Sequence, residues 1–410
     1  MKLTYKHTVA ACCLSYILQA AVINLAPLLF TTLQKTYGVS LTELASLVLI
    51  MFVTQILSDI AAVKLVVVLG YRASALVACG LDAIGMALLG ILPGLLDSAF
   101  AALVISIVTM SVGAGLTDCI VSPLIDSISQ NAKASHMSLM HSCYSWGHVL
   151  VILLTTGSLW LIGRENWFLL PLGWAVFAVI TLISFAVVPM IETEKSEKGS
   201  SPRQLLFSGR FLLFAFIMLC GGASEQIMAQ WTSLFAETGL GVTKTIGDLL
   251  GPCLFALFMA IGRTAYGIIG KKLNIEKALM SSLLLTVMAY LITVFGHYPA
   301  LSLAGCALSG FGVSLLWPGT VSMTSEKIPG GTAMFGLLAL AGDTGCSLGP
   351  WLTGMISDAV ISSGVGSSVA GRIGMPIDEL GLKCGIFAGI LFPGAMLILI
   401  LLFKRKEKRR

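Results

Sequence analysis

Charged residues are scarce in this sequence: Asp, Glu, Lys and Arg together make up only 11% of its 410 residues. A soluble domain needs far more charge than this to cover its surface. Hydrophobic residues reach 57% of the chain, and the mean hydropathy is +0.94. The composition therefore excludes an ordinary soluble protein and predicts an integral membrane protein that is surrounded by the lipid bilayer.

Signatures of ATP-driven pumps and of metal sites are also missing. No segment matches the phosphate-binding loop Gly-x-x-x-x-Gly-Lys-Ser/Thr, and the zinc-protease pattern His-Glu-x-x-His is absent. The ten cysteines lie within or at the ends of apolar segments without metal-ligand spacing, so they are interpreted as small packing residues. We therefore expect a protein that is not an enzyme, is not driven by ATP and has no metal or bound cofactor.

What the sequence does contain is a succession of apolar segments. Each is about 20 residues or longer, enough for a helix to cross a hydrocarbon core of ~30 Å. Because backbone groups in lipid need internal partners, each segment is predicted to be helical. We predict an all-α membrane protein of twelve transmembrane helices in two pseudo-symmetric six-helix bundles. The segments lie near 8–32, 42–66, 72–96, 98–126, 136–162, 167–190, 210–237, 246–270, 277–296, 299–323, 331–360 and 382–403.

A strongly polar run, Glu192–Arg203, separates the first six segments from the last six. Many transporters consist of two such repeats joined by a polar linker. A second long connection, 361–381, is rich in Gly and Ser and is interpreted as a mobile connector. The predicted division is a bundle over 1–191, a cytoplasmic linker over 192–208, a second bundle over 209–404 and a basic cytoplasmic tail over 405–410.

The distribution of Lys and Arg predicts the orientation in the membrane. With both termini in the cytoplasm, most of the 25 Lys and Arg residues fall on the cytoplasmic side, as the positive-inside rule requires. A basic run after the last apolar segment fits a solvated anchor, so no nucleic-acid partner is expected. We predict a multi-pass protein of the inner membrane that is a monomer. The five cations left on the outer side are Lys35, Arg164, Lys244, Arg372 and Lys383.

Several local patterns resemble the major facilitator superfamily, and within it the fucose permease branch of sugar:proton symporters. Asp118–Pro123 is similar to that branch's acid followed four residues later by Asn-Pro, with Ser in place of Asn. Ile261–Arg263, Trp317-Pro318 and the glycine-rich Gly342–Pro350 follow its C-terminal pattern. The resemblance implies the major facilitator fold, alternating access and transport of a sugar with a proton.

Two features differ from relatives within that superfamily. The position of the fucose permease acid in the first helix aligns here with Pro27, which argues against fucose itself as the solute. The Gly-x-x-x-Gly-Pro run that marks many drug:proton antiporters in their fifth helix lies here in segment 331–360 instead. This second difference favours a symporter over a drug exporter.

Two acids are candidates for proton coupling. A charged side chain at the centre of a membrane helix costs roughly 2.5–3.5 kcal/mol on insertion scales, so each one asks for an explanation. Asp118 lies in the middle of segment 98–126, and Glu225 lies in segment 210–237 beside Gly221 and Gly222. A buried acid is typical of proton relays, although a structural pair is the alternative for both residues.

Amide, imidazole and aromatic side chains within the apolar segments are candidates for binding the solute. Amides donate and accept hydrogen bonds to hydroxyl groups, and an aromatic face packs on the C–H groups of a sugar ring. Helix–helix hydrogen bonding or core packing is the alternative for each of them. A metal site at the histidines is rejected because no acidic or cysteine partner is near in sequence. The candidates are Gln19, Asn24, His141, Tyr144, Gln226, Gln230, Trp231 and Trp317.

Three further charges are interpreted as gating or structural groups. Arg263 cannot lose its charge in a protein, so it is expected to pair with an acid or with carbonyl groups. Asp59 and Asp343 lie on helices predicted to meet between the two bundles, where polar contacts would latch one end-state. A direct role of Arg263 in binding a carboxylate is the alternative, and it would indicate an organic-acid substrate.

Together these features predict a proton-coupled symporter of a small polar solute, with sugar as the favoured class. A proton-coupled exporter of drugs or metabolites is the first alternative, and it requires an aromatic-rich apolar cavity. An organic-acid transporter is the second alternative. A non-transporting receptor or scaffold is the third, and it would move nothing across a liposome membrane.

Overall fold

The computed structural model describes residues 4–39, 41–128, 133–190, 201–328 and 331–408, and every regular element within them is a helix. The chain divides into two compact units, one of Met1–Leu205 with Pro329–Leu340 and one of Leu206–Ile328 with Ala341–Arg410. The division falls inside the predicted linker 192–208, of which residues 192–200 lie outside the described residues. The grouping of 329–340 with the first unit is a feature that the sequence analysis lacks.

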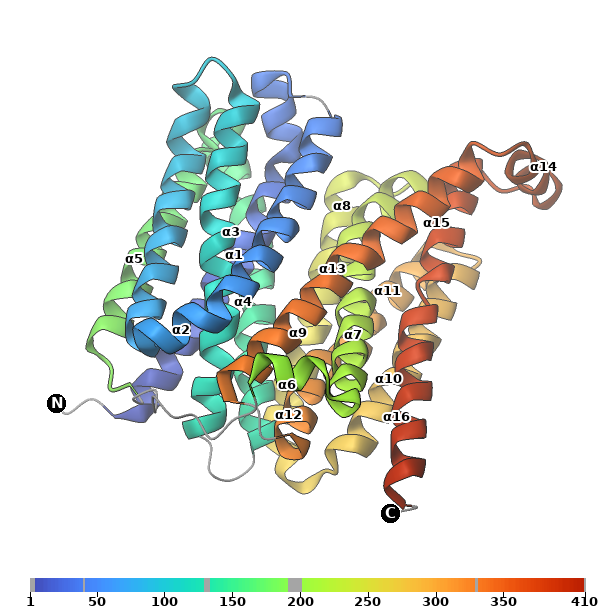
Figure 1. Cartoon of the computed structure of the whole chain (residues 1–410). Coiled ribbons are helices and arrows are strands. Elements are labelled where there is room, and N and C mark those ends of the chain that lie inside the picture. Colours follow the sequence, from blue (N-terminus) through green and yellow to red (C-terminus); the bar gives the residue numbers. More distant parts are fainter. Residues whose placement is uncertain (1–3, 40, 129–132, 191–200, 329–330, 409–410) are drawn as a thin grey trace. The chain divides into compact units, whose positions relative to one another are not determined.

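The first unit contains five long helices (Figure 1). α4 packs along α1, while α3 and α5 pack against α2. Short 3-10 turns at Leu92–Gly94 and Arg164–Asn166 precede α3 and α5. The helices are α1 (Tyr5–Tyr37), α2 (Leu41–Ile91), α3 (Ala99–Ile128), α4 (Lys133–Ile162) and α5 (Leu169–Val187).

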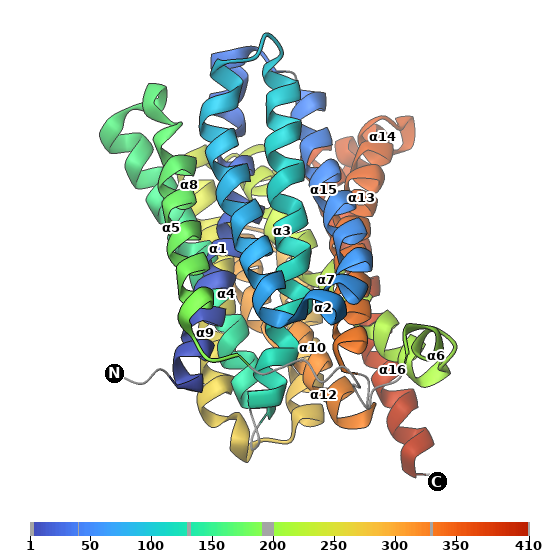
Figure 2. The same ribbon diagram turned by 60° about the vertical axis from the view of Figure 1, so that its left-hand side comes forward.

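The predicted helices 42–66 and 72–96 form one element, α2, which bends sharply at Gly70 (Figure 2). Gly70 has φ 81° and ψ 164°, a backbone conformation open only to glycine. The bend therefore lies at the break that the sequence predicts, and it separates two helical halves of α2. Arg72 follows directly and donates from Nη1 to Phe185 O at 3.0 Å and from Nη2 to Val188 O at 2.8 Å. This guanidinium satisfies the last carbonyl groups of α5, where a cation is favourable.

The second unit contains the remaining helices, several of them broken within one predicted span. A π-helical turn at Leu249–Cys253 contains Pro252, which cannot donate a backbone hydrogen bond, and it joins α8 to α9. A second π turn, Phe235–Gly239, extends α7, and a 3-10 turn, Gly270–Lys272, follows α9. The helices are α6 (Pro202–Leu206, of which only Leu206 belongs to this unit), α7 (Gly209–Leu234), α8 (Lys244–Asp248), α9 (Leu254–Ile269), α10 (Ile275–Phe295), α11 (Pro299–Val313), α12 (Leu316–Lys327), α13 (Gly331–Ile361, shared with the first unit), α14 (Gly364–Ile373), α15 (Ile377–Ala388) and α16 (Leu391–Lys408).

The connection 361–381, interpreted from its Gly and Ser content as a mobile connector, is helical over much of its length. α14 begins after Ser363, whose hydroxyl accepts a hydrogen bond from Gly366 N at 2.8 Å. It ends at Gly374, whose φ of 66° is the left-handed conformation typical of a helix end. Capping residues at both ends explain how a glycine-rich segment forms a helix.

Ten helical stretches among the described residues are long and apolar enough to cross a membrane. One of them, Ser46–Gly94, has 49 residues and is long enough for two crossings. α13 adds a further helix of 31 residues. The all-α membrane architecture and the expected number of crossings are therefore confirmed.

The helices α7 and α13 approach so closely that glycine is required at their crossing. A β-carbon added to Gly345 of α13 would collide with the backbone carbonyl of Leu219 in α7. One added to Gly222 of α7 would collide with the carbonyl of Gly342 in α13. Backbone atoms cannot move aside as a flexible side chain can, so the sequence pattern of small residues sets this contact.

We expect Gly345→Ala to destabilise the protein by about 1–3 kcal/mol, since the added methyl group overpacks the crossing. Elsewhere in a helix the same substitution is favourable by about 1 kcal/mol. Gly394→Ala in α16 is the matched control, because a β-carbon there would meet nothing within 4 Å. Thermal unfolding in detergent measures both variants, and equal midpoints would contradict the close crossing.

Candidate functional site

Asp118 lies in the middle of α3 and is buried among polar groups of the first unit. Its Oδ2 accepts a hydrogen bond from Gln19 Nε2 of α1 at 2.8 Å and from Gln55 Nε2 of α2 at 3.2 Å. Both glutamines are buried as well. Two amide donors on one oxygen are an arrangement suited to an ionised carboxylate, which only accepts hydrogen bonds.

A second acid belongs to the same cluster. Oxygen atoms of Asp59 on α2 and of Asp118 lie within 4.8 Å of each other, and Asp59 is fully buried. Two carboxylates this close repel each other when both are ionised, and the repulsion is strong away from water. Binding of one proton removes it. The pair of acids is therefore suited to taking up and releasing a proton. Asp59, predicted as a gating or structural charge, lies beside the proton-coupling candidate Asp118.

The other predicted polar residues of the first unit form two groups of contacts. The ring of His141 on α4 lies 5.0 Å from the ring of Tyr16 on α1, measured between centroids. Tyr16 also contacts Ser122 of α3, with 3.5 Å between the hydroxyl oxygens. The amide of Asn24 donates to Tyr144 at 3.3 Å and to Ala20 O at 2.8 Å. His141 is therefore linked through Tyr16 to the helix that carries Asp118, while Asn24 and Tyr144 form a separate pair.

In the second unit, Glu225 and Arg263 form a buried ion pair. Glu225 of α7 accepts from Arg263 Nη2 of α9 at 2.8 Å, and the two side chains are 8% and 2% exposed. Arg263 also donates from Nε to Ser314 O at 3.1 Å. The arginine thus has an acid and a carbonyl group as partners. Glu225 is held as a carboxylate by a cation, an environment unlike the neutral amides around Asp118.

The remaining candidates of the second unit gather around α7 and α13. Gln226 is buried, whereas Gln230 is exposed and only 3.5 Å from it, a long contact between Nε2 and Oε1. Trp231 donates from Nε1 to Pro350 O at 3.1 Å. Trp317 packs over Gly342, where a β-carbon would collide with its ring. Both indoles are therefore fixed against α13.

Asp343 of α13 is buried in the second unit. Its predicted part in a latch between the two bundles stays a prediction. The same α13 contains the pentapeptide Gly345–Gly349, which matches the hydrolase pattern Gly-x-Ser-x-Gly. That pattern needs a strand-to-helix turn to expose its serine, and here it lies inside a long helix, so the match carries no catalytic meaning.

Two buried polar residues were missed in the sequence. Gln55 lies four residues before Asp59, so the two share one face of α2, a spacing that marks it as a partner of the acid cluster. Asp82 lies in the second half of α2 and is 2% exposed. Its Oδ1 has no hydrogen-bond partner among the described residues and lies against Gly113 of α3. An acid inside the apolar segment 72–96 was the available signal for Asp82.

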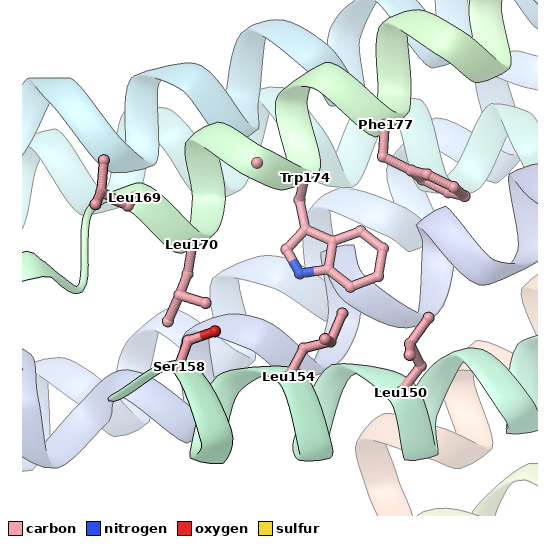
Figure 3. A pocket seen from close by; sticks show the side chains of 8 residues that line it. Leu150, Leu154, Ser158, Leu169, Leu170, Trp174 and Phe177 are labelled. Carbon is pink, nitrogen blue, oxygen red and sulfur yellow. The ribbon is translucent and has the colours of Figure 1, made fainter. Parts of the chain in front are cut away.

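A hollow of about 390 Å³ lies between α4 and α5, and its lining is mostly apolar, unlike the polar cluster around Asp118. Trp174 projects from α5 toward Leu154 of α4, and leucines form most of the remaining wall (Figure 3). Leu150, Leu154 and Leu169 are 41%, 45% and 47% exposed. Exposed leucines on the outer face of a membrane helix contact lipid. The hollow is therefore interpreted as a lipid-facing groove, and it does not support the aromatic cavity that a drug exporter requires.

The family model of the Major Facilitator Superfamily matches residues 12–361 of the sequence. The chain belongs to the major facilitator superfamily. No curated protein matches the sequence. The local sequence motifs predicted membership of this superfamily, and the match to the family model confirms that prediction.

Solved structures show the same fold at low sequence identity. The fucose:proton symporter of E. coli is 13% identical with a TM-score of 0.75, covering 97% of this chain and 99% of that one. A proton:xylose symporter is 13% identical with a TM-score of 0.73, covering 98% and 95%. The human organic anion transporter MFSD10 is 16% identical with a TM-score of 0.71, covering 97% and 100%. At these identities the similarity establishes the fold alone.

Proposed function

We propose that this major facilitator is a proton-coupled symporter of a small polar solute, with sugar as the favoured class. The observation that carries the proposal is the buried Asp118, held by two neutral amides and within 4.8 Å of Asp59. In this proposal Asp118 binds the coupling proton, and alternating access moves proton and solute together. Two of the similar structures named above are sugar:proton symporters, which supports the substrate class.

The polar residues near Asp118 support a hydroxylated solute. Gln19, Tyr16 and His141 offer donors and acceptors for hydroxyl groups, and Asn24 with Tyr144 extends the polar surface. In the second unit, Gln226 and the indoles of Trp231 and Trp317 are proposed as further contacts. The excess of Lys and Arg on one side supports an inner-membrane location with both termini in the cytoplasm.

Organic acids are the second candidate class. The similarity to a human organic anion transporter favours it, and Arg263 is the cation that would bind a carboxylate. Arg263 is already paired with Glu225 at 2.8 Å, so an anionic solute would have to displace this acid. The ion pair therefore makes the neutral, hydroxylated class the better-supported one.

Purified protein in liposomes tests the proposal. With an inward proton gradient, we expect uptake of one or more monosaccharides from a panel of sugars and organic acids, with acidification of the interior. A thermal-shift screen in detergent selects the solute first, since a ligand at about 100 times its Kd stabilises the state it binds by about 2.7 kcal/mol. Uptake that continues after an uncoupler collapses the gradient would contradict proton coupling. Proton movement opposite to the solute would identify an exporter.

A further inference from the structure

We infer that the amide groups of Gln19 and Gln55 couple the protonation of Asp118 to solute binding. When Asp118 is protonated, one amide turns, accepts the new O–H and frees its NH2 group to bind the solute. This makes both glutamines positioning residues of the coupling reaction. The inference rests on the proposed function, because it requires Asp118 to bind the coupling proton and a hydroxylated solute to bind nearby.

The first observation is that each amide is only half satisfied. Nε2 of Gln19 and Nε2 of Gln55 donate to the same Oδ2 of Asp118. Oε1 of each glutamine is buried and has no hydrogen-bond partner within the described part of the chain. The dimensions of an amide group keep each Oε1 within about 5 Å of the carboxylate oxygen. Two buried acceptors without donors therefore lie beside the acid, although buried polar groups are almost always hydrogen-bonded.

The second step is what happens when Asp118 takes up a proton. The neutral acid has one O–H donor that needs an acceptor, whereas the ionised form only accepts. An amide exchanges its donor and acceptor when it turns by half a rotation about its last bond. If one glutamine turns, its Oε1 accepts the new O–H of Asp118. The unpartnered oxygen and the new donor then satisfy each other.

The third step links this rotation to the solute. The NH2 group of the turned amide no longer faces the carboxylate and is free to donate to a hydroxyl oxygen of the solute. Proton binding at Asp118 then creates a donor for the solute, and solute binding favours the protonated acid by the same factor. The ligand class that fits such a donor is a neutral polyhydroxylated molecule.

Other titratable groups lie on the elements packed against α3 in the same unit. Asp59 and Asp82 are on α2, Tyr16 is on α1 and His141 is on α4. Asp59 adds a like charge within 4.8 Å, which makes proton uptake by the pair more favourable. The amide hydrogen bonds of Gln19 and Gln55 both end on Asp118. Loss of one amide therefore changes the proton equilibrium of this acid directly.

Gln55→Met tests the inference, because methionine keeps the length of the side chain and removes both amide atoms. One donor to the ionised form is lost, so the midpoint of the pH profile of uptake moves to higher pH by roughly one unit. The KM for the sugar also becomes less dependent on pH, a change that a purely structural role would not produce. Gln19→Met is expected to act in the same direction. Gln204→Met on the exposed α6 is the matched control and leaves the profile unchanged.

A measurement on the unaltered protein keeps the inference testable where a variant does not fold. Infrared difference spectra of protein with isotope-labelled glutamine are expected to show a glutamine carbonyl shift when the pH is lowered. Unchanged glutamine bands, or variant pH profiles that coincide with the wild type, would overturn the inference. Failure of the proposed function gives a different result, since the wild-type protein then shows no proton-driven uptake at any pH.

Discussion

Replacing Asp118 with asparagine is expected to abolish accumulation of the solute driven by a proton gradient, while exchange of internal for external solute continues. Asparagine has nearly the shape of the protonated acid but cannot release a proton. Like the protonated acid, its side chain accepts from one glutamine amide and donates to the Oε1 of the other, turned one, so the cluster keeps its packing. The carrier then stays in the state that binds solute, which permits exchange but not net uptake against a gradient.

Counterflow and gradient-driven uptake in the same liposomes measure the two halves of this prediction. Asp97→Asn is the matched control, because Asp97 is exposed in the connection before α3. It is expected to leave both activities unchanged. Full accumulation by Asp118→Asn would show that the coupling proton binds elsewhere, and Asp82 and Glu225 would be the next acids to replace.

Much of the fold follows from the sequence because hydrophobicity and helix length are local properties. The bend of α2 at Gly70 lies in the predicted gap between segments 42–66 and 72–96, and the apolar runs predicted the membrane-crossing helices. The positive φ of Gly70 and the contacts of Arg72 with α5 depend on tertiary packing.

Only part of the candidate site could be predicted from the sequence. Asp118 stands out in the sequence because an acid inside an apolar segment costs free energy on membrane insertion and is therefore a candidate functional residue. Its partners lie 99 and 63 residues away in the chain, so no sequence window contains them. Gln19 was predicted to contact the solute, which stays a prediction, and its hydrogen bond to Asp118 was not foreseen. Gln55 had no place in the prediction, since its relation to Asp118 depends on how α2 packs against α3.

The ion pair of Glu225 and Arg263 carries the second large expected effect. Arg263→Met leaves the carboxylate of Glu225 buried without its cation, and breaking such a pair destabilises a protein by about 3–5 kcal/mol. Adding Glu225→Gln removes the unpaired charge, so the double variant is expected to recover most of this loss. Thermal unfolding in detergent measures the cycle. Arg372→Met on the exposed face of α14 is the control. Equal destabilisation by the single and double variants would contradict a pairing role.

The same double variant separates a structural role of Glu225 from a proton-carrying one. Glutamine at 225 cannot take up or release a proton, whatever the stability of the fold. If Asp118 alone binds the coupling proton, the double variant accumulates solute at close to the wild-type level once the fraction of folded protein is equalised. If Glu225 is a second proton site, accumulation is lost although the fold is restored. Because Arg263 holds Glu225 in an ion pair at 2.8 Å, while Asp118 accepts from two neutral amides and lies beside a second acid, we expect the first result.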